Sequence, residues 1–134
     1  MIYLDTNIFI YALTAENARA EECKKVIEEI ARGDKKGCTS VLTWDEVIHV
    51  LTKEKGKEIA VQESKQFLMI PHLLFCKADR EVIMMAQEIV EQYDLDPRDS
   101  IHAATALING AQEIISNDSD FDRIKELKRI PLRK

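Results

Sequence analysis

Two aspartates stand just after short apolar runs that read as buried strands. Asp5 follows the run at residues 2–4, and Asp118 comes three residues after the run at residues 113–115. In open α/β sheets, ligands bind in the crevice beyond the carboxyl ends of the strands. Both carboxylates are therefore candidates for chemistry at such a crevice, although a helix-capping role explains each one equally well when it is taken alone.

A third acid, Glu46, is placed by helical geometry. The helix predicted around it has a broad apolar stripe of Val41, Trp44, Val47, Ile48 and Leu51. Glu46 lies off that stripe, yet Leu42 and Val50 are its i−4 and i+4 neighbours. A lone acid in a row that is apolar on both sides faces either a solvated edge or a site.

The fourth acid, Asp99, lies at the start of a helix that is predicted to run to residue 108. The helix dipole stabilises a negative charge at this position. That effect alone accounts for Asp99 structurally, so the case for a functional site depends on the four acids as a set.

Four carboxylates that converge on one crevice repel each other strongly. Such an arrangement persists only with raised pKa values or a bound cation. A ligand set made of oxygens favours Mg²⁺ or Mn²⁺ over zinc or copper, and such a cluster suits phosphodiester hydrolysis. Residue types and spacing alone indicate an acid-lined crevice and leave open whether it holds a metal.

Short apolar strands alternate with longer helical segments along the chain. Strands are predicted at residues 2–4, 37–39, 72–76, 113–115 and 127–130. Helices are predicted at residues 8–13, 17–32, 40–54, 57–68, 79–93 and 97–108, with Thr39 or Ser40 as the cap of the third. The alternation is typical of βα units, so we predict an α/β fold with helices on both faces of a mainly parallel sheet. A length of 134 residues predicts a single domain, residues 1–134.

The composition excludes several classes of protein. Apolar residues make up 46% of the chain, but no apolar run approaches the ~20 residues of a membrane span. The chain opens on its first apolar run without a basic lead or signal core, so we expect no secretion. The three cysteines and three histidines form neither a CxxC nor an HxH or HxxxH pair, so a catalytic zinc site is not expected.

The net charge of −5 contrasts with the basic footprint that nucleic-acid binders usually show. Two bound divalent cations would bring this charge close to neutral. From residue 123 to the end the chain carries six basic residues and one acid. This basic segment reads more simply as a solvated face than as a phosphate-binding patch.

Four segments, in order along nearly the whole chain, resemble the PIN-domain family. They are Ile2-Tyr3-Leu4-Asp5-Thr6-Asn7, Ser40-Val41-Leu42-Thr43-Trp44-Asp45-Glu46-Val47, Arg98-Asp99-Ser100-Ile101-His102-Ala103-Ala104-Thr105-Ala106-Leu107 and Ile114-Ile115-Ser116-Asn117-Asp118-Ser119-Asp120-Phe121. Any one of these segments alone is weak evidence for the resemblance, but all four in this order are strong evidence. The resemblance implies a three-layer α/β/α fold with a short, mainly parallel central sheet, and the activity of a Mg²⁺- or Mn²⁺-dependent endoribonuclease.

The resemblance also carries roles onto particular residues. The acidic catalytic positions of the family match Asp5, Glu46, Asp99 and Asp118, of which Asp5, Asp99 and Asp118 are the implied metal ligands. Its supporting polar positions match Thr6, Asn7 and Ser116, the last where many members have threonine. Asp120 leaves open which acid of residues 118–120 touches the metal; we favour Asp118, with Asp120 assisting.

Two residues close to Asp99 in the sequence are given simpler interpretations than a catalytic role. Arg98 adjoins the expected site and could contact phosphate, but a solvated arginine is the simpler interpretation. His102 follows Asp99 by one helical turn and is given a mainly structural role.

A stand-alone domain of this length is similar to the VapC-type toxins of the family. That likeness implies a small antitoxin as partner, a homodimer, a bacterial or archaeal cytoplasm, and structured RNA such as transfer RNA as substrate. Three alternatives stay open at this point. They are a phosphoacceptor domain of the receiver type, a PIN-like binding module without catalysis, and a PIN nuclease of RNA maturation. A phosphoacceptor domain would need a second acid in a DxD motif at residues 5–7 and a lysine directly after residues 113–115, and this sequence has neither.

Overall fold

The structure, a computed structural model, describes residues 1–132. The basic Arg133 and Lys134 therefore lie outside the described residues. The helices are α1 (Thr6–Thr14), α2 (Ala18–Ala31), α3 (Thr43–Lys55), α4 (Lys57–Leu68), α5 (Arg80–Gln92), α6 (Pro97–Ile108) and the short 3₁₀ helix η1 (Ser119–Arg123). The strands are β1 (Ile2–Leu4), β2 (Gly37–Ser40), β3 (Leu73–Cys76), β4 (Glu113–Ile115) and β5 (Lys128–Ile130). Within residues 1–132, we find no helix with the length and apolar character to cross a bilayer.

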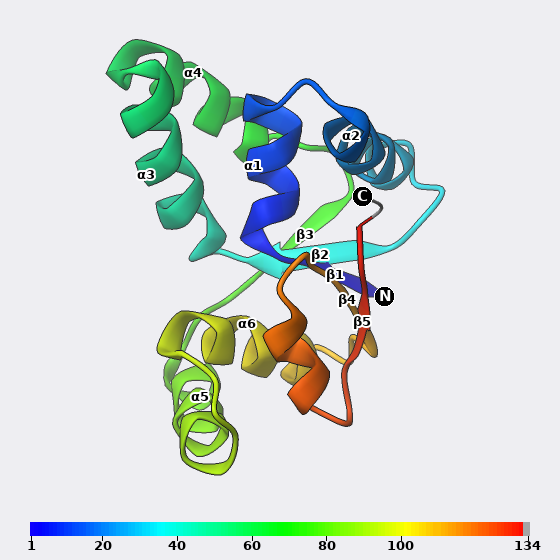
Figure 1. Cartoon of the computed structure of the whole chain (residues 1–134), viewed down its shortest axis with the longest axis vertical. Coiled ribbons are helices and arrows are strands. Elements are labelled where there is room, and N and C mark those ends of the chain that lie inside the picture. The colour runs from blue at the N-terminus through cyan, green and yellow to red at the C-terminus, as the bar shows by residue number, and fades with distance from the viewer. Residues whose placement is uncertain (133–134) are drawn as a thin grey trace.

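The five strands form one sheet in the order β3-β2-β1-β4-β5, in which neighbouring strands run parallel. The chain builds outward from β1 through β2 to β3, and then returns to place β4 on the other side of β1 (Figure 1). The order of the strands therefore reverses between β1 and β4. In open α/β sheets, such a switch point opens a crevice at the carboxyl ends of the strands, and Asp5 directly follows β1 there.

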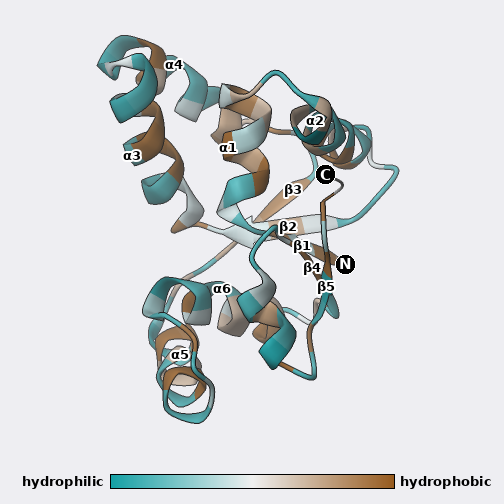
Figure 2. Ribbon diagram, viewed as in Figure 1, coloured by the Kyte–Doolittle hydropathy of each residue, from teal (hydrophilic) through white to brown (hydrophobic). Residues whose placement is uncertain are grey.

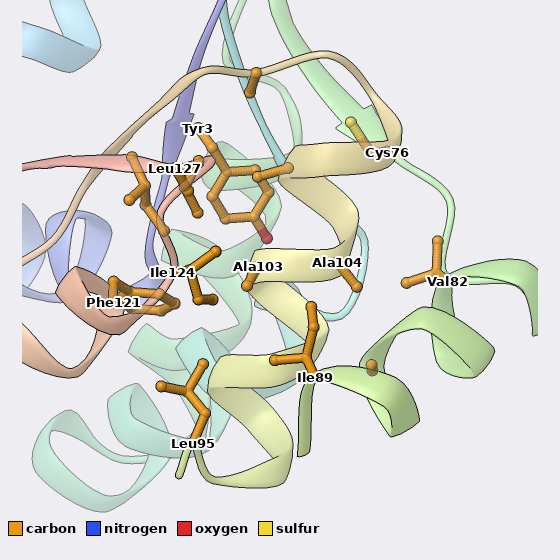
Figure 3. Packing of buried hydrophobic residues seen from close by; sticks show 14 of the residues in the cluster. Tyr3, Cys76, Val82, Ile89, Leu95, Ala103, Ala104, Phe121, Ile124 and Leu127 are labelled. Atoms are coloured by element: carbon orange, nitrogen blue, oxygen red, sulfur yellow. The ribbon is translucent and has the colours of Figure 1, made fainter. Parts of the chain in front are cut away.

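Helices cover both faces of the sheet, with α1 to α4 on one side and α5, α6 and η1 on the other (Figure 1). Successive strand residues point to opposite faces. Tyr3 accordingly belongs to the core beneath α5 and α6, and Leu4 to the core beneath α1 to α4. Figure 3 shows the first core, where Tyr3, Ala103 and Phe121 come together from β1, α6 and η1. The predicted three-layer α/β/α fold is confirmed.

Local signals set most helix boundaries. The side chain of Asn17 accepts from the backbone N–H of Ala20 at 2.9 Å, and that of Asp79 accepts from Val82 at 3.1 Å. Such caps satisfy backbone donors that have no partner within the helix. Apolar and polar residues alternate around the helices, so each has a face for the core (Figure 2).

The predicted start of α3 is wrong. Thr39 and Ser40 cap no helix; they stay in β2, where Ser40 pairs with Cys76 of β3. The backbone N–H of Val41 also donates to the Cys76 carbonyl, so sheet pairing continues past the strand. The helix begins only at Thr43, after a turn, and Leu42 precedes it without a side-chain cap.

The apolar stripe predicted for α3 is only half buried. Val47 and Leu51 are fully buried, whereas 42% of Val41 and 39% of Trp44 are exposed. The later start of the helix accounts for Val41, because this residue lies in the turn rather than on a helical face.

Candidate functional site: an acidic crevice

Three acids lie together beyond the carboxyl ends of the central strands. Asp99, Asp118 and Asp120 each offer a carboxylate oxygen, and these oxygens lie within 4.8 Å of one another. Asp99 lies in the first turn of α6, where the Asp96 side chain accepts its backbone N–H at 2.9 Å. Asp118 caps η1 by accepting the backbone N–H of Asp120 at 2.9 Å. Two helix starts therefore direct their acids at one point.

Asp5 stands at the end of β1 and is 5% exposed. Its carboxylate accepts the backbone N–H of Thr6 at 2.8 Å and the hydroxyl of Ser116 at 2.6 Å. The Ser116 oxygen in turn accepts the backbone N–H of Asp118 at 3.0 Å. A single hydroxyl thus connects the acid after β1 with the acid after β4.

Burial and like charge raise the pKa values of Asp5 and Asp99. Burial is the largest cause for Asp5, and its hydrogen bonds and the nearby His102 only partly oppose the rise in pKa. The pKa of Asp99 is raised to about 8, first by burial and then by a hydrogen bond shared with Asp118. The charges of Asp96 and Asp5 raise this pKa further. The crevice thus holds more negative charge than its own polar groups neutralise.

Glu46 reaches the same crevice from α3. Its Oε1 accepts from Nε2 of His102 at 2.9 Å, and its side chain is 24% exposed. Burial raises the pKa of Glu46, but the hydrogen bonds from His102 and Thr6 outweigh it and hold this pKa below its usual value. The sequence left open whether Glu46 faces a solvated edge or a site, and in the structure it faces the site.

The remaining predicted residues lie around these acids. Thr6 is buried, with its hydroxyl 3.2 Å from Nε2 of His102. Asn7 is half-buried, and its Oδ1 has no hydrogen-bond partner among the residues that the structure describes. Arg98 is exposed and lines two small cavities, of about 110 and 170 Å³, together with Glu46.

Two features of the site differ from what the sequence predicted. Asp120 belongs to the tight group of three acids, whereas Asp5 lies outside that group. His102, which was given a mainly structural role, contacts Glu46 directly and lies 3.7 Å from Asp5. Its spacing of one helical turn from Asp99 was the available signal, because residues three apart share a helix face.

The ligand set fits a divalent metal. Its donors are carboxylate oxygens, which hard cations such as Mg²⁺ and Mn²⁺ prefer. Burial is the largest cause of the raised pKa of Asp99, and the neighbouring acids add a repulsion that a cation would relieve. The arrangement can therefore bind a metal close to an ionised glutamate, at the topological switch point of the sheet.

The fold and the group of acids can now be compared with those of known protein families. The sequence matches the PIN domain family over residues 2–127, and the chain belongs to this family. It is 24% identical over 143 residues to "Ribonuclease VapC2" of Methanocaldococcus jannaschii, covering 98% of this chain and 93% of that protein.

Two solved structures share the fold. A toxin-antitoxin complex from Klebsiella pneumoniae is 22% identical, with a TM-score of 0.72 over 95% of each chain. VapC20 from Mycobacterium tuberculosis, described as a Sarcin-Ricin loop cleaving toxin, is 19% identical, with a TM-score of 0.74 over 91% of this chain and 93% of that one.

The contact between Ser116 and Asp5 leads to a testable expectation. Ser116→Ala should weaken Mn²⁺ binding by about 10–100-fold, because the hydroxyl orients a carboxylate of the crevice. It should also lower the free energy of unfolding by about 1–3 kcal/mol, since a buried acceptor loses its donor. Calorimetric Mn²⁺ titration and urea unfolding measure the two effects. Ser116→Thr keeps the hydroxyl and serves as the control; an alanine variant with parental Mn²⁺ affinity would contradict this role of Ser116.

Proposed function

We propose that this chain is a Mg²⁺- or Mn²⁺-dependent endoribonuclease of the VapC type. The observation that carries the proposal is the group of Asp99, Asp118 and Asp120, with Asp5 beside it, at the switch point of a PIN-family fold. In this proposal residues 1–134 act as one nuclease domain. The catalytic acids are Asp5, Glu46, Asp99 and Asp118, and Asp120 supports the metal ligands Asp5, Asp99 and Asp118.

The charge and contacts of each side chain indicate its role in this proposal. A bound divalent cation would lower the pKa of a water and offset the charge that develops on the phosphate. Hydrogen bonds hold the pKa of Glu46 below its usual value, so Glu46 is ionised and would be the group in the crevice that takes up a proton. The Oδ1 of Asn7, which has no hydrogen-bond partner among the described residues, can accept a hydrogen bond from a bound water or from the RNA, and Ser116 holds Asp5 in place. Arg98 lies at the edge of the crevice, where its charge can bind a neighbouring phosphate.

The proposed substrate is a structured RNA such as transfer RNA. The name of the curated relative and the description of VapC20 support an RNA substrate. The negative net charge of the chain argues against broad binding of any nucleic acid, because that mode depends on a basic surface. A narrow set of RNAs, selected by shape around the crevice, fits this charge better.

The proposed partner is a small antitoxin, in the cytoplasm of the host cell. The toxin-antitoxin complex from Klebsiella pneumoniae supports this proposal. An apolar groove of about 270 Å³ between α1, α2 and α4 offers a surface for a partner segment, and its lining includes Phe9, Leu13, Ile27, Phe67 and Ile70. We also propose a homodimer, in which a second copy could cover exposed apolar side chains such as those of Trp44 and Met69.

The proposal is tested by incubating the purified protein, freed of any bound partner, with a pool of structured RNAs. Cleavage is expected with Mg²⁺ or Mn²⁺ and not with EDTA. Asp118→Asn should abolish it, whereas Asp34→Asn should not. Asp34 is exposed and lies before β2, at the amino ends of the strands, so it loses the same charge far from the crevice. Failure of the protein to bind Mn²⁺ or to cleave any RNA would favour a PIN-like module without catalysis.

A further inference from the structure

His102 is a buried histidine that joins side chains from several elements. It lies on α6, one turn after Asp99, and is 2% exposed. Its Nδ1 lies 2.6 Å from the hydroxyl of Tyr3 on β1, and the two rings pack edge to face. Its Nε2 lies 2.9 Å from Oε1 of Glu46 on α3. Both ring nitrogens therefore have a polar partner at hydrogen-bond distance.

The surroundings of Tyr3 set the direction of these hydrogen bonds. The backbone N–H of Ser40 donates to the Tyr3 oxygen at 3.1 Å, so the tyrosine proton is free to point at Nδ1 of His102. Burial and the charge of Asp5 raise the pKa of Tyr3, and the hydroxyl keeps its proton. With Nδ1 as the acceptor, the neutral imidazole carries its proton on Nε2. A charged imidazolium carries a proton there as well, so in either form Nε2 donates to Glu46.

Glu46 and His102 approach the crevice from opposite faces of the sheet. α3 belongs to the layer of α1 to α4, and α6 to the other layer (Figure 1). A long, partly exposed side chain such as Glu46 has several rotamers open to it. An imidazole that is itself fixed at Nδ1 by a strand residue removes this freedom, and catalytic geometry needs a fit within about 0.5 Å.

We propose that Tyr3 and His102 form a hydrogen-bonded relay that positions the Glu46 carboxylate in the crevice. The relay runs from the Ser40 backbone through Tyr3 and His102 to Glu46, and so from β2 and β1 through α6 to α3. The inference rests on the proposed nuclease function, in which Glu46 accepts a proton. Tyr3 and His102 are positioning residues, since they act on the reaction through Glu46.

The first test is Tyr3→Phe, which removes only the hydroxyl. We expect kcat to fall by about 10–100-fold, the range typical of lost orienting contacts around an active site. KM for RNA and the Mn²⁺ affinity should change by less than about twofold, because the metal ligands stay in place. Tyr93→Phe, the same change at a half-buried tyrosine of the α5 end, is the matched control with unchanged kcat. An unchanged kcat in Tyr3→Phe, or a loss confined to Mn²⁺ affinity, would overturn the relay.

The second test needs no cleavage. Nitrogen-15 NMR of the imidazole reports which ring nitrogen of His102 carries a proton, with His102→Gln used to assign the signals. For the neutral imidazole, the relay predicts a proton on Nε2 in the parent protein and a redistribution between the two nitrogens in Tyr3→Phe. A proton on Nδ1 alone would overturn the relay even in a fully active protein. A proton on Nε2 in a protein that cleaves no RNA would count against the proposed function and not against the hydrogen-bonded arrangement.

Discussion

Asp99→Asn should abolish metal-dependent RNA cleavage, with a rate more than about 100-fold below that of the parent protein. The asparagine has nearly the same shape but no negative charge, so the crevice loses a ligand for the cation. In addition to burial, three neighbouring acids raise the pKa of Asp99, namely Asp118, Asp96 and Asp5. Its loss should therefore affect the whole cluster.

The same substitution should leave the metal-free protein folded and at least as stable as the parent. It removes one of several repelling carboxylates and keeps the hydrogen bond between the backbone N–H of residue 99 and Asp96. Circular dichroism and thermal unfolding in EDTA measure fold and stability beside the cleavage assay. Asp34→Asn, with the same loss of charge at the other edge of the sheet, is the control. A stable Asp99→Asn protein that cleaves at the parental rate would refute the assignment of Asp99.

The metal-free protein should lose stability as the pH rises from about 4 to about 8. The pKa of Asp99 is about 8 in the folded protein and about 3.9 in an unfolded chain. Between these values the unfolded chain has released a proton that the folded protein still holds, so each rise in pH favours unfolding. The contribution is complete below the lower value and is lost as the pH passes the upper one. Asp5, whose pKa burial also raises, adds to the trend in the same direction.

Mn²⁺ should reverse this trend, because carboxylates bind metal in their ionised form. An ion present at about 100 times its dissociation constant stabilises by about 2.7 kcal/mol, which is roughly 10 °C in Tm for a chain of this size. Thermal unfolding between pH 5 and pH 8, in EDTA and in Mn²⁺, measures both effects. Asp99→Asn should show a shallower dependence on pH in EDTA and a smaller shift with Mn²⁺. Parallel curves for the parent and Asp99→Asn would rule out Asp99 as the titrating group.

Helix boundaries could be predicted well where the signal is local. Asn17 and Gly33 delimit α2, and Gly56 separates α3 from α4, because each residue satisfies or permits a backbone geometry within a few positions of itself. The start of α3 could not be predicted in this way. Ser40 is a good capping residue, but its pairing with Cys76 of β3 retains it in the sheet. A contact across 36 residues outweighed the local preference.

The sequence alone determined which acids are present and where along their strands and helices they stand. It thereby determined that an oxygen-lined crevice should form at the carboxyl ends of parallel strands. The tertiary structure decided which atoms meet. Ser116 reaches Asp5 because β4 returns to the side of β1, and Asp120 joins Asp99 because η1 turns toward the start of α6.

The partner of Glu46 was likewise decided by the fold. Glu46, His102 and Tyr3 are separated by tens of residues, and no spacing along the chain connects them. They meet because two helix layers pack on opposite faces of a sheet whose central strand carries Tyr3. Local patterns report the conformation of a few neighbouring residues, whereas contacts of this kind depend on strand order and layer packing, which the whole chain sets together.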